Sequence, residues 1–152
     1  MKTVIVFIAC VVCIQLFACD KNNEIASNST DISNTDSMKL KITIGTNTFT
    51  AVLYNNTTAA AFKKKLPLTI NMSELNGNEK YYDLPGNLPS TASNPGTIQA
   101  GDVMLYGSNT LVLFYKTFPT SYNYSRIARI DNPSRLADAL GSGNKTVMFE
   151  LE

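Results

Sequence analysis

Alternation of apolar and polar residues is the main pattern of the chain from residue 38 onward. Leu40, Ile42 and Ile44 alternate with lysine and threonine, Gly45 begins a short polar turn, and the alternation resumes over residues 48–54. A period of two residues is typical of a strand with one buried face. Two such runs around a tight turn predict a β-hairpin.

Further strands are predicted over residues 66–75, 79–83, 102–106, 110–116, 122–131 and 146–151. The first of them continues the same alternation, and residues 102–106 and 110–116 form a second hairpin around Gly107-Ser108-Asn109. A short helix is expected between the cap-forming residues 55–58 and Pro67, and a second over residues 133–140. The prolines and glycines between residues 76 and 100 predict long surface loops. We therefore expect a mainly β fold, a closed antiparallel barrel with two short helices.

Residues 1–18 have the character of an export signal. Lys2 precedes an apolar run over residues 4–17 that is too short to span a bilayer comfortably. The run ends at Leu16-Phe17-Ala18-Cys19, which resembles the lipobox of bacterial lipoproteins, so we expect cleavage before Cys19 and acylation of that residue. The alternative is an ordinary signal peptide cut nearby. The expected location is the bacterial cell envelope, lipid-anchored at the outer membrane or periplasmic face.

Residues 19–37 are expected to form a flexible tether, since they are rich in Asn, Ser, Thr and Asp and show no apolar period. The domain then covers residues 38–152. Cys10 and Cys13 form a C-x-x-C spacing, but both lie in the apolar run and would be removed with it. Cys19 alone would remain, so no disulfide is expected to hold the domain together.

Composition and charge exclude several classes of function. The 152 residues contain no His, which excludes Ser-His-Asp triads, Cys-His dyads and imidazole acid–base chemistry. The 13 Lys and Arg residues against 12 Asp and Glu give a net charge of +1, and loss of Lys2 with the signal would leave zero. We therefore expect no nucleic-acid partner. No motif indicates a cofactor or a metal site.

Several short segments share their order and spacing with a known family. They are Leu53, Asn56, Thr58-Ala59, Phe62, Leu66-Pro67-Leu68, Met72, Leu75, Gly77, Glu79-Lys80-Tyr81, Gly101-Asp102, Leu105-Tyr106, Phe114-Tyr115 and Tyr124-Ser125-Arg126-Ile127. Together they resemble the bacterial cyclophilin-like domain family over essentially all of residues 39–152. The resemblance implies a closed eight-stranded antiparallel β-barrel with a helix at each end.

The true cyclophilins of this fold are peptidyl-prolyl isomerases whose chemistry relies largely on one Arg beside an apolar pocket. This sequence lacks their Phe-His-Arg and Phe-Met-x-Gln-Gly-Gly segments. Alternation along residues 122–130 puts Arg126 on one face with Tyr122, Tyr124, Ala128 and Ile130, which makes Arg126 the candidate catalytic residue. The residues favour a structural role instead, with Arg126 paired to a carboxylate such as Glu79 or stacked on a tyrosine.

The leading functional hypothesis is an exported, lipid-anchored cyclophilin-like domain that binds a peptide or a small ligand without the typical isomerase residues. The tyrosine-rich second half of the chain suggests a groove, and the candidate ligand-binding residues are Tyr81, Glu79, Tyr115 and Tyr124. Tyrosines packed in the barrel core are the alternative. A peptidyl-prolyl isomerase that uses Arg126 is the alternative function. A redox flavoprotein as partner is a third hypothesis, which rests on analogy with relatives alone.

Overall fold

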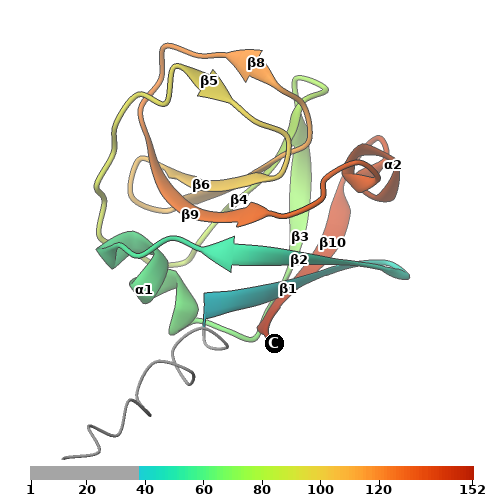
Figure 1. The fold of residues 1–152 in the computed structure, drawn as a ribbon, viewed down its shortest axis with the longest axis horizontal. Coiled ribbons are helices and arrows are strands. Elements are labelled where there is room, and N and C mark those ends of the chain that lie inside the picture. Colours follow the sequence, from blue (N-terminus) through green and yellow to red (C-terminus); the bar gives the residue numbers. More distant parts are fainter. Residues whose placement is uncertain (1–37) are drawn as a thin grey trace, which may run out of the picture.

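The structure is a computed structural model, and it describes residues 38–152. The strands and helices of this part of the chain, shown in Figure 1, are β1 (Lys39–Ile44), β2 (Asn47–Leu53), α1 (Thr57–Lys63), β3 (Leu68–Leu75), β4 (Glu79–Asp83), β5 (Thr97–Ile98), β6 (Asp102–Tyr106), β7 (Thr110–Phe114), β8 (Phe118–Pro119), β9 (Tyr124–Ile130), α2 (Leu136–Leu140) and β10 (Lys145–Leu151). The predicted signal, the acylation site at Cys19 and the tether lie outside the described residues. Neither helix has the length and apolar character needed to cross a membrane.

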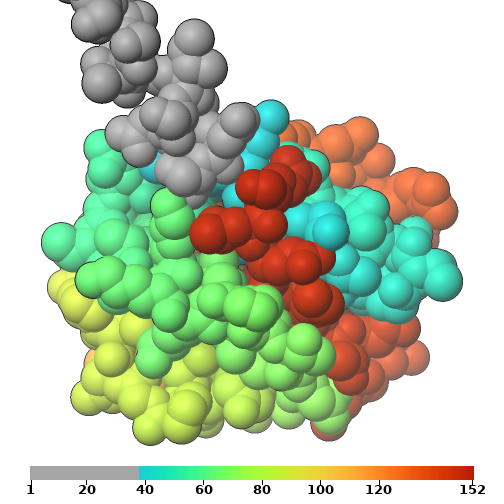
Figure 2. All heavy atoms as spheres, turned by 90° about the horizontal axis from the view of Figure 1, so that it is seen from below, coloured from blue at the N-terminus to red at the C-terminus, as the bar shows by residue number. Residues whose placement is uncertain are grey.

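Eight of the strands close into an antiparallel barrel in the order β1-β10-β3-β4-β7-β6-β9-β2. The predicted mainly β fold, a closed antiparallel barrel with two short helices, is therefore confirmed. The C-terminal strand β10 closes the barrel, because it pairs with β1 on one side and with β3 on the other. Figure 2 shows this strand on the surface, between the first strands and the segment that contains α1 and β3.

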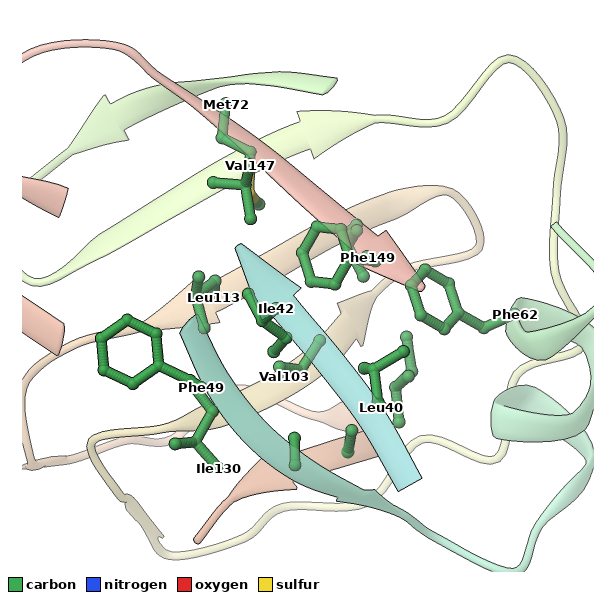
Figure 3. Packing of buried hydrophobic residues seen from close by; sticks show 14 of the residues in the cluster. Leu40, Ile42, Phe49, Phe62, Met72, Val103, Leu113, Ile130, Val147 and Phe149 are labelled. Carbon is green, nitrogen blue, oxygen red and sulfur yellow. The ribbon is translucent and has the colours of Figure 1, made fainter. Parts of the chain in front are cut away.

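The barrel interior is filled by buried apolar residues, which we call the interior cluster (Figure 3). Most of them come from the strands, and Phe62 of α1, Leu136 and Leu140 of α2, and Leu84 and Leu88 of the loop after β4 join them. Leu40, Ile42 and Phe149 are fully buried in it. Removing a side chain of this size from water stabilises a fold by roughly 1.5 to 3 kcal/mol. A core built from seven of the eight strands, with Tyr82 of β4 packed against it, therefore holds this domain together without a disulfide among the described residues.

Helix α1 closes one end of the barrel. Asn56 caps it, since its side-chain oxygen accepts a hydrogen bond of 2.8 Å from the backbone N–H of Ala59. The Asn56 amide group also donates to the backbone carbonyl of Arg126 over 2.9 Å, which ties the helix to β9. On its buried face, Phe62 meets Phe149 edge-on with ring centroids 5.8 Å apart (Figure 3).

A β-bulge in β9 changes which of its side chains face the core. Val103 pairs with Ala128, but the next residue, Met104, pairs with Arg126, so Ile127 is an additional residue on β9. The predicted single face for residues 122–130 is therefore wrong. Ile127, Ala128 and Ile130 belong to the interior cluster, whereas Tyr124 and Arg126 lie on the outer face of the barrel.

A two-stranded ribbon of β5 and β8 lies outside the barrel, at the top of Figure 1. The sequence predicts a loop at β5, from the prolines and glycines between residues 76 and 100, and predicts no strand at β8. Each of these strands has only two residues, which is too short for a periodic signal. The ribbon covers part of the outer face of β6, β7 and β9 through a second apolar cluster, the outer cluster. This cluster contains Ile98, Met104, Val112, Phe114 and Tyr124, with Tyr81 and Phe118 packed against it.

Candidate functional site

An open cleft of about 570 Å³ lies beside the outer cluster. Its lining comes from four places: the β3–β4 turn, the outward-facing residues of β4, the β6–β7 hairpin, and the segment that runs from β8 into β9. The lining residues are Leu75, Asn76, Asn78, Glu79, Tyr81, Asp83, Tyr106, Thr110, Val112, Phe118, Pro119, Thr120, Ser121, Tyr122 and Tyr124. A concave surface of this size with convergent polar groups is the usual form of a ligand site.

Strand β4 supplies the acidic side of the cleft. Its alternate residues Glu79, Tyr81 and Asp83 all line the cleft, because successive side chains of a strand point to opposite faces of the sheet. Asp83 accepts a hydrogen bond of 2.6 Å from the Thr110 hydroxyl group on the neighbouring strand β7. Two carboxylates therefore stand on either side of one tyrosine along a single strand.

The opposite side of the cleft is the segment from β8 to the start of β9. Backbone hydrogen bonds fix it to residues 93–96: Thr120 donates to the carbonyl of Gly96 over 2.9 Å, and Ser93 and Tyr124 exchange two bonds of 3.0 Å. The Asn94 side chain supports the same loop by accepting from the Gly96 N–H. The proline-rich loop thus positions this side of the cleft.

Aromatic rings meet at the mouth of the cleft. Tyr106 and Tyr122 pack edge to face with ring centroids 6.0 Å apart, and Tyr106 also lies 5.6 Å from Tyr124. Tyr122 is 61% exposed and Tyr106 is 46% exposed, whereas Tyr124 is buried. The cleft therefore offers two exposed rings above a buried one, with room for a ligand to contact them.

Two polar groups of the cleft are left with unfavourable surroundings. Burial, together with the negative charge of nearby Glu74, raises the pKa of Glu79. The side-chain oxygen of Asn78 is buried and accepts no hydrogen bond from the described residues. A buried acceptor without a donor costs free energy, as does a charge on a half-buried carboxyl group.

Arg126 lies outside the lining of the cleft. Its guanidinium carbon lies 5.6 Å from the centroid of the Tyr54 ring, and its Nη1 donates to the Tyr54 hydroxyl group over 3.4 Å. Tyr54 follows β2, the neighbour of β9 on the side away from β6. Of the two structural roles considered for Arg126, the geometry matches stacking on a tyrosine, and Arg126 forms no ion pair with Glu79.

Tyr115 also lies away from the cleft, in a group that we call the buried lysine cluster. The hydroxyl group of Tyr115 donates to Glu74 Oε1 over 2.7 Å, and Glu74 forms an ion pair with Lys80. Lys80 has no exposed surface, and its ammonium group also donates to the carbonyls of Gly141 and Gly143 over 2.8 and 2.6 Å. Burial first, and then the bond to Glu74, raise the pKa of Tyr115 to about 12.

Three of the five sequence-predicted site residues therefore meet in the cleft: Glu79, Tyr81 and Tyr124. Arg126 and Tyr115 do not join them. The alternation of residues 79, 81 and 83 along β4 is the sequence signal that identifies Asp83 as a lining residue. The sequence contains no periodic signal that places the segment from β8 to β9 opposite β4. That arrangement depends on the pairing of β5 with β8. Residues 38–152 hold no group of three or more potential metal ligands.

A closed antiparallel barrel whose site lies on the outer face, beside a short external ribbon, defines the class as a cyclophilin-like barrel. The sequence profile of the Cyclophilin-like family matches residues 42–151, and the chain belongs to this family. The chain is also similar to a solved structure, the solution structure of the hypothetical protein AF2241 from Archaeoglobus fulgidus. The identity is 20% over 76% of this chain and 95% of that chain, with a TM-score of 0.50, which shows the fold alone. No curated protein matches.

Proposed function

We propose that this chain is an exported, lipid-anchored binding domain that takes a peptide or a small ligand in the outer cleft. The observation that carries the proposal is the lining of the cleft, which combines exposed tyrosine rings with two carboxylates. These groups supply stacking area and hydrogen-bonding capacity, which are the usual means of ligand recognition. The sequence lacks both isomerase segments, which favours binding over catalysis.

A nuclear magnetic resonance titration tests the proposed binding site. The isotope-labelled chain is titrated with a mixed set of short peptides and small ligands, and we expect shift changes that centre on residues of the cleft, with Tyr81 and Tyr122 among them. Tyr122→Ala removes the most exposed ring and should weaken binding, whereas Leu151→Ala, at an apolar residue on β10 that is 40% exposed and lies outside the cleft lining, should leave it unchanged. Shift changes that centre elsewhere, or equal effects of the two variants, would contradict the proposal.

The proposed anchor is tested separately. A bacterium that expresses the chain is supplied with a palmitate analogue that can be detected after incorporation. We expect the chain to be labelled and to sediment with membranes, because two or three acyl chains on Cys19 give stable anchoring. Cys19→Ala should lose both properties. A wild-type chain that stays unlabelled would overturn the lipid-anchor part of the proposal and leave the cleft proposal intact.

One observation favours the alternative function, a peptidyl-prolyl isomerase that uses Arg126. The Arg126 side chain is partly exposed on the outer face, and its single hydrogen bond to the Tyr54 hydroxyl group is long. A coupled proline-isomerisation assay separates the two functions. Activity that disappears in Arg126→Ala and survives in Arg129→Ala would establish the isomerase. Absence of activity in the wild-type chain, or unchanged activity in Arg126→Ala, would exclude this mechanism.

A further inference from the structure

The outer cleft is acidic on one side and has no basic residue in its lining. Glu79 and Asp83 point into it, and none of the lining residues is Lys or Arg. None of the ion pairs formed among residues 38–152 involves either carboxylate. The chain as a whole carries almost no net charge, so this local excess of negative charge is a property of the site alone.

The structure of β4 explains why the cleft lacks a counter-charge. Lys80 lies between Glu79 and Tyr81 in the sequence, but its side chain lies on the opposite face of the strand, which faces the barrel interior. There its ammonium group is already bound to Glu74 and to two backbone carbonyls. The ammonium group of Lys80 therefore already has three hydrogen-bond partners. A positive charge that complements the cleft has to come from a ligand.

Burial of Glu79 points in the same direction. Its carboxylate is half-buried, and its pKa is raised by that burial and by the nearby negative charge of Glu74. An ionised carboxylate in such surroundings is held at a cost in free energy. A bound cation would offset this cost, whereas an anionic ligand would increase it.

The rings at the mouth complete the recognition surface. Tyr106 and Tyr122 are exposed, and Leu75, which is 40% exposed, lies on the lining beside the acidic strand. An ammonium or guanidinium group is attracted to the face of a tyrosine ring, and an aliphatic chain packs against Leu75. A side chain with an apolar stem and a charged end matches both kinds of surface.

We propose that the ligand of this cleft is a peptide segment that inserts a Lys or Arg side chain between the carboxylates of β4 and the exposed tyrosines. This inference rests on the proposed binding function and adds the charge of the ligand to it. Asp83, which is already held by the Thr110 hydroxyl group, fixes one carboxylate in place. Glu79 supplies the second carboxylate.

Three matched peptides test the inference. They are acetylated and amidated pentapeptides, Ala-Leu-X-Leu-Ala, in which X is lysine, norleucine or glutamate, and their affinity for the chain is measured by nuclear magnetic resonance titration at low salt. We expect the lysine peptide to bind about tenfold more tightly than the norleucine peptide, with the glutamate peptide weakest. Raising the salt concentration should reduce this preference, because the interacting charges are partly exposed to solvent and are screened by salt.

Variants of the chain identify the carboxylates. The double variant Glu79→Gln and Asp83→Asn should bind the lysine and norleucine peptides equally, while the matched variant Glu150→Gln, at an acidic residue on β10, should keep the full preference. Thermal unfolding of each variant verifies that the barrel remains folded. A preference that persists in the double variant would overturn the inference.

The remaining outcomes separate this inference from the proposed function. If the lysine and norleucine peptides bind the cleft equally well in the wild-type chain, the cleft is a binding site but the ligand charge is wrong. If none of the three peptides shifts the cleft residues, the inference is overturned, whereas the proposed function is decided by the titration with the mixed set of ligands. n-Butylamine is titrated as a further probe, and binding as tight as that of the lysine peptide would replace the peptide by a small amine.

Discussion

Lys80 and Glu74 form an ion pair across the neighbouring strands β4 and β3, although Lys80 has no exposed surface at all. The Glu74 carboxylate also accepts hydrogen bonds from the Tyr115 hydroxyl group and from the Gly77 N–H. Glu74 therefore links β3, β4, the end of β7 and, through Lys80, the loop after α2. The pair stabilises that end of the barrel only as long as both charges are present.

We expect Glu74→Gln to lower the free energy of unfolding by about 3 kcal/mol, because it leaves the buried ammonium group of Lys80 without its counter-charge. The measurement is equilibrium unfolding in urea. Glu150→Gln is the control, since Glu150 pairs with Lys41 at 2.7 Å on the exposed side of the barrel. A pair in water contributes little, and the control should change stability by less than about 1 kcal/mol. Equal losses would contradict this account of Glu74.

Glu74 and Glu79 should contribute opposite dependences of the free energy of unfolding on pH. Burial alone would raise the pKa of Glu74, but hydrogen bonds from Lys80 and Tyr115 outweigh it and leave the pKa below its usual value. A lowered folded-state pKa stabilises the fold above the unfolded pKa of about 4.3, and this contribution is lost as the pH falls through the folded value. The stability lead of the wild type over Glu74→Gln should therefore shrink at acid pH.

Glu79 has a raised pKa in the fold, so its ionisation destabilises the domain at neutral pH. The penalty is removed as the pH falls through the folded pKa towards the unfolded value. We expect Glu79→Gln to be at least as stable as the wild type at pH 7 and to lose any advantage below about pH 4. The urea midpoints of the wild type and of Glu79→Gln, measured from pH 3 to pH 8, provide the test. A Glu79→Gln variant that is clearly less stable than the wild type at pH 7 would refute the prediction.

Most of the barrel could be predicted from the sequence, because all eight predicted strands correspond to strands of the closed sheet. The exceptions have local physical causes. The extra residue Ile127 breaks the alternation of β9, and nothing in the period of that strand marks the bulge. The ribbon pairs Thr97 and Ile98 with Phe118 and Pro119, and two residues are too few for a periodic signal.

The candidate site divides in the same way. Glu79 and Tyr81 follow from the alternation of β4, which is local information. The prediction for Arg126 rests on an alternation that the bulge of β9 interrupts, and the prediction for Tyr115 rests on its chemical type. The positions of both side chains depend on partners from distant segments. Tyr54 holds Arg126 from 72 residues away, and Glu74 holds Tyr115 from 41 residues away.

Gly101 is expected to be the glycine least tolerant of substitution. Its φ is +91°, and a Cβ atom there would lie 3.1 Å from the Cβ atoms of both Ile130 and Pro133. Gly101→Ala should therefore lower the free energy of unfolding by about 2 to 3 kcal/mol, through backbone strain and crowding together. Gly107 has a φ of +60° but open space around it, so Gly107→Ala measures the backbone strain alone. A loss at Gly107 as large as that at Gly101 would show that crowding contributes nothing.

Asn56 joins two elements that lie far apart in the sequence, α1 and β9. Its side-chain oxygen caps α1 through the Ala59 N–H, and its amide group donates to the Arg126 carbonyl at the bulge of β9. Replacing Asn56 with Ala removes the cap and the side-chain donor to that carbonyl, so we expect the free energy of unfolding to fall by about 1 to 3 kcal/mol. Asn55→Ala, at an exposed neighbour, should cost less than about 0.5 kcal/mol.

A second measurement on Asn56→Ala separates its two hydrogen bonds. Hydrogen exchange at the first turn of α1 reports the cap, whereas exchange in β9 around Ile127 reports the bond to the Arg126 carbonyl. Asn56→Asp retains an acceptor for the Ala59 N–H and cannot donate to Arg126. We therefore expect Asn56→Asp to restore protection of α1 and to leave β9 as exposed to exchange as in Asn56→Ala. Restored protection in both elements would mean that the link between Asn56 and β9 does not stabilise the bulge.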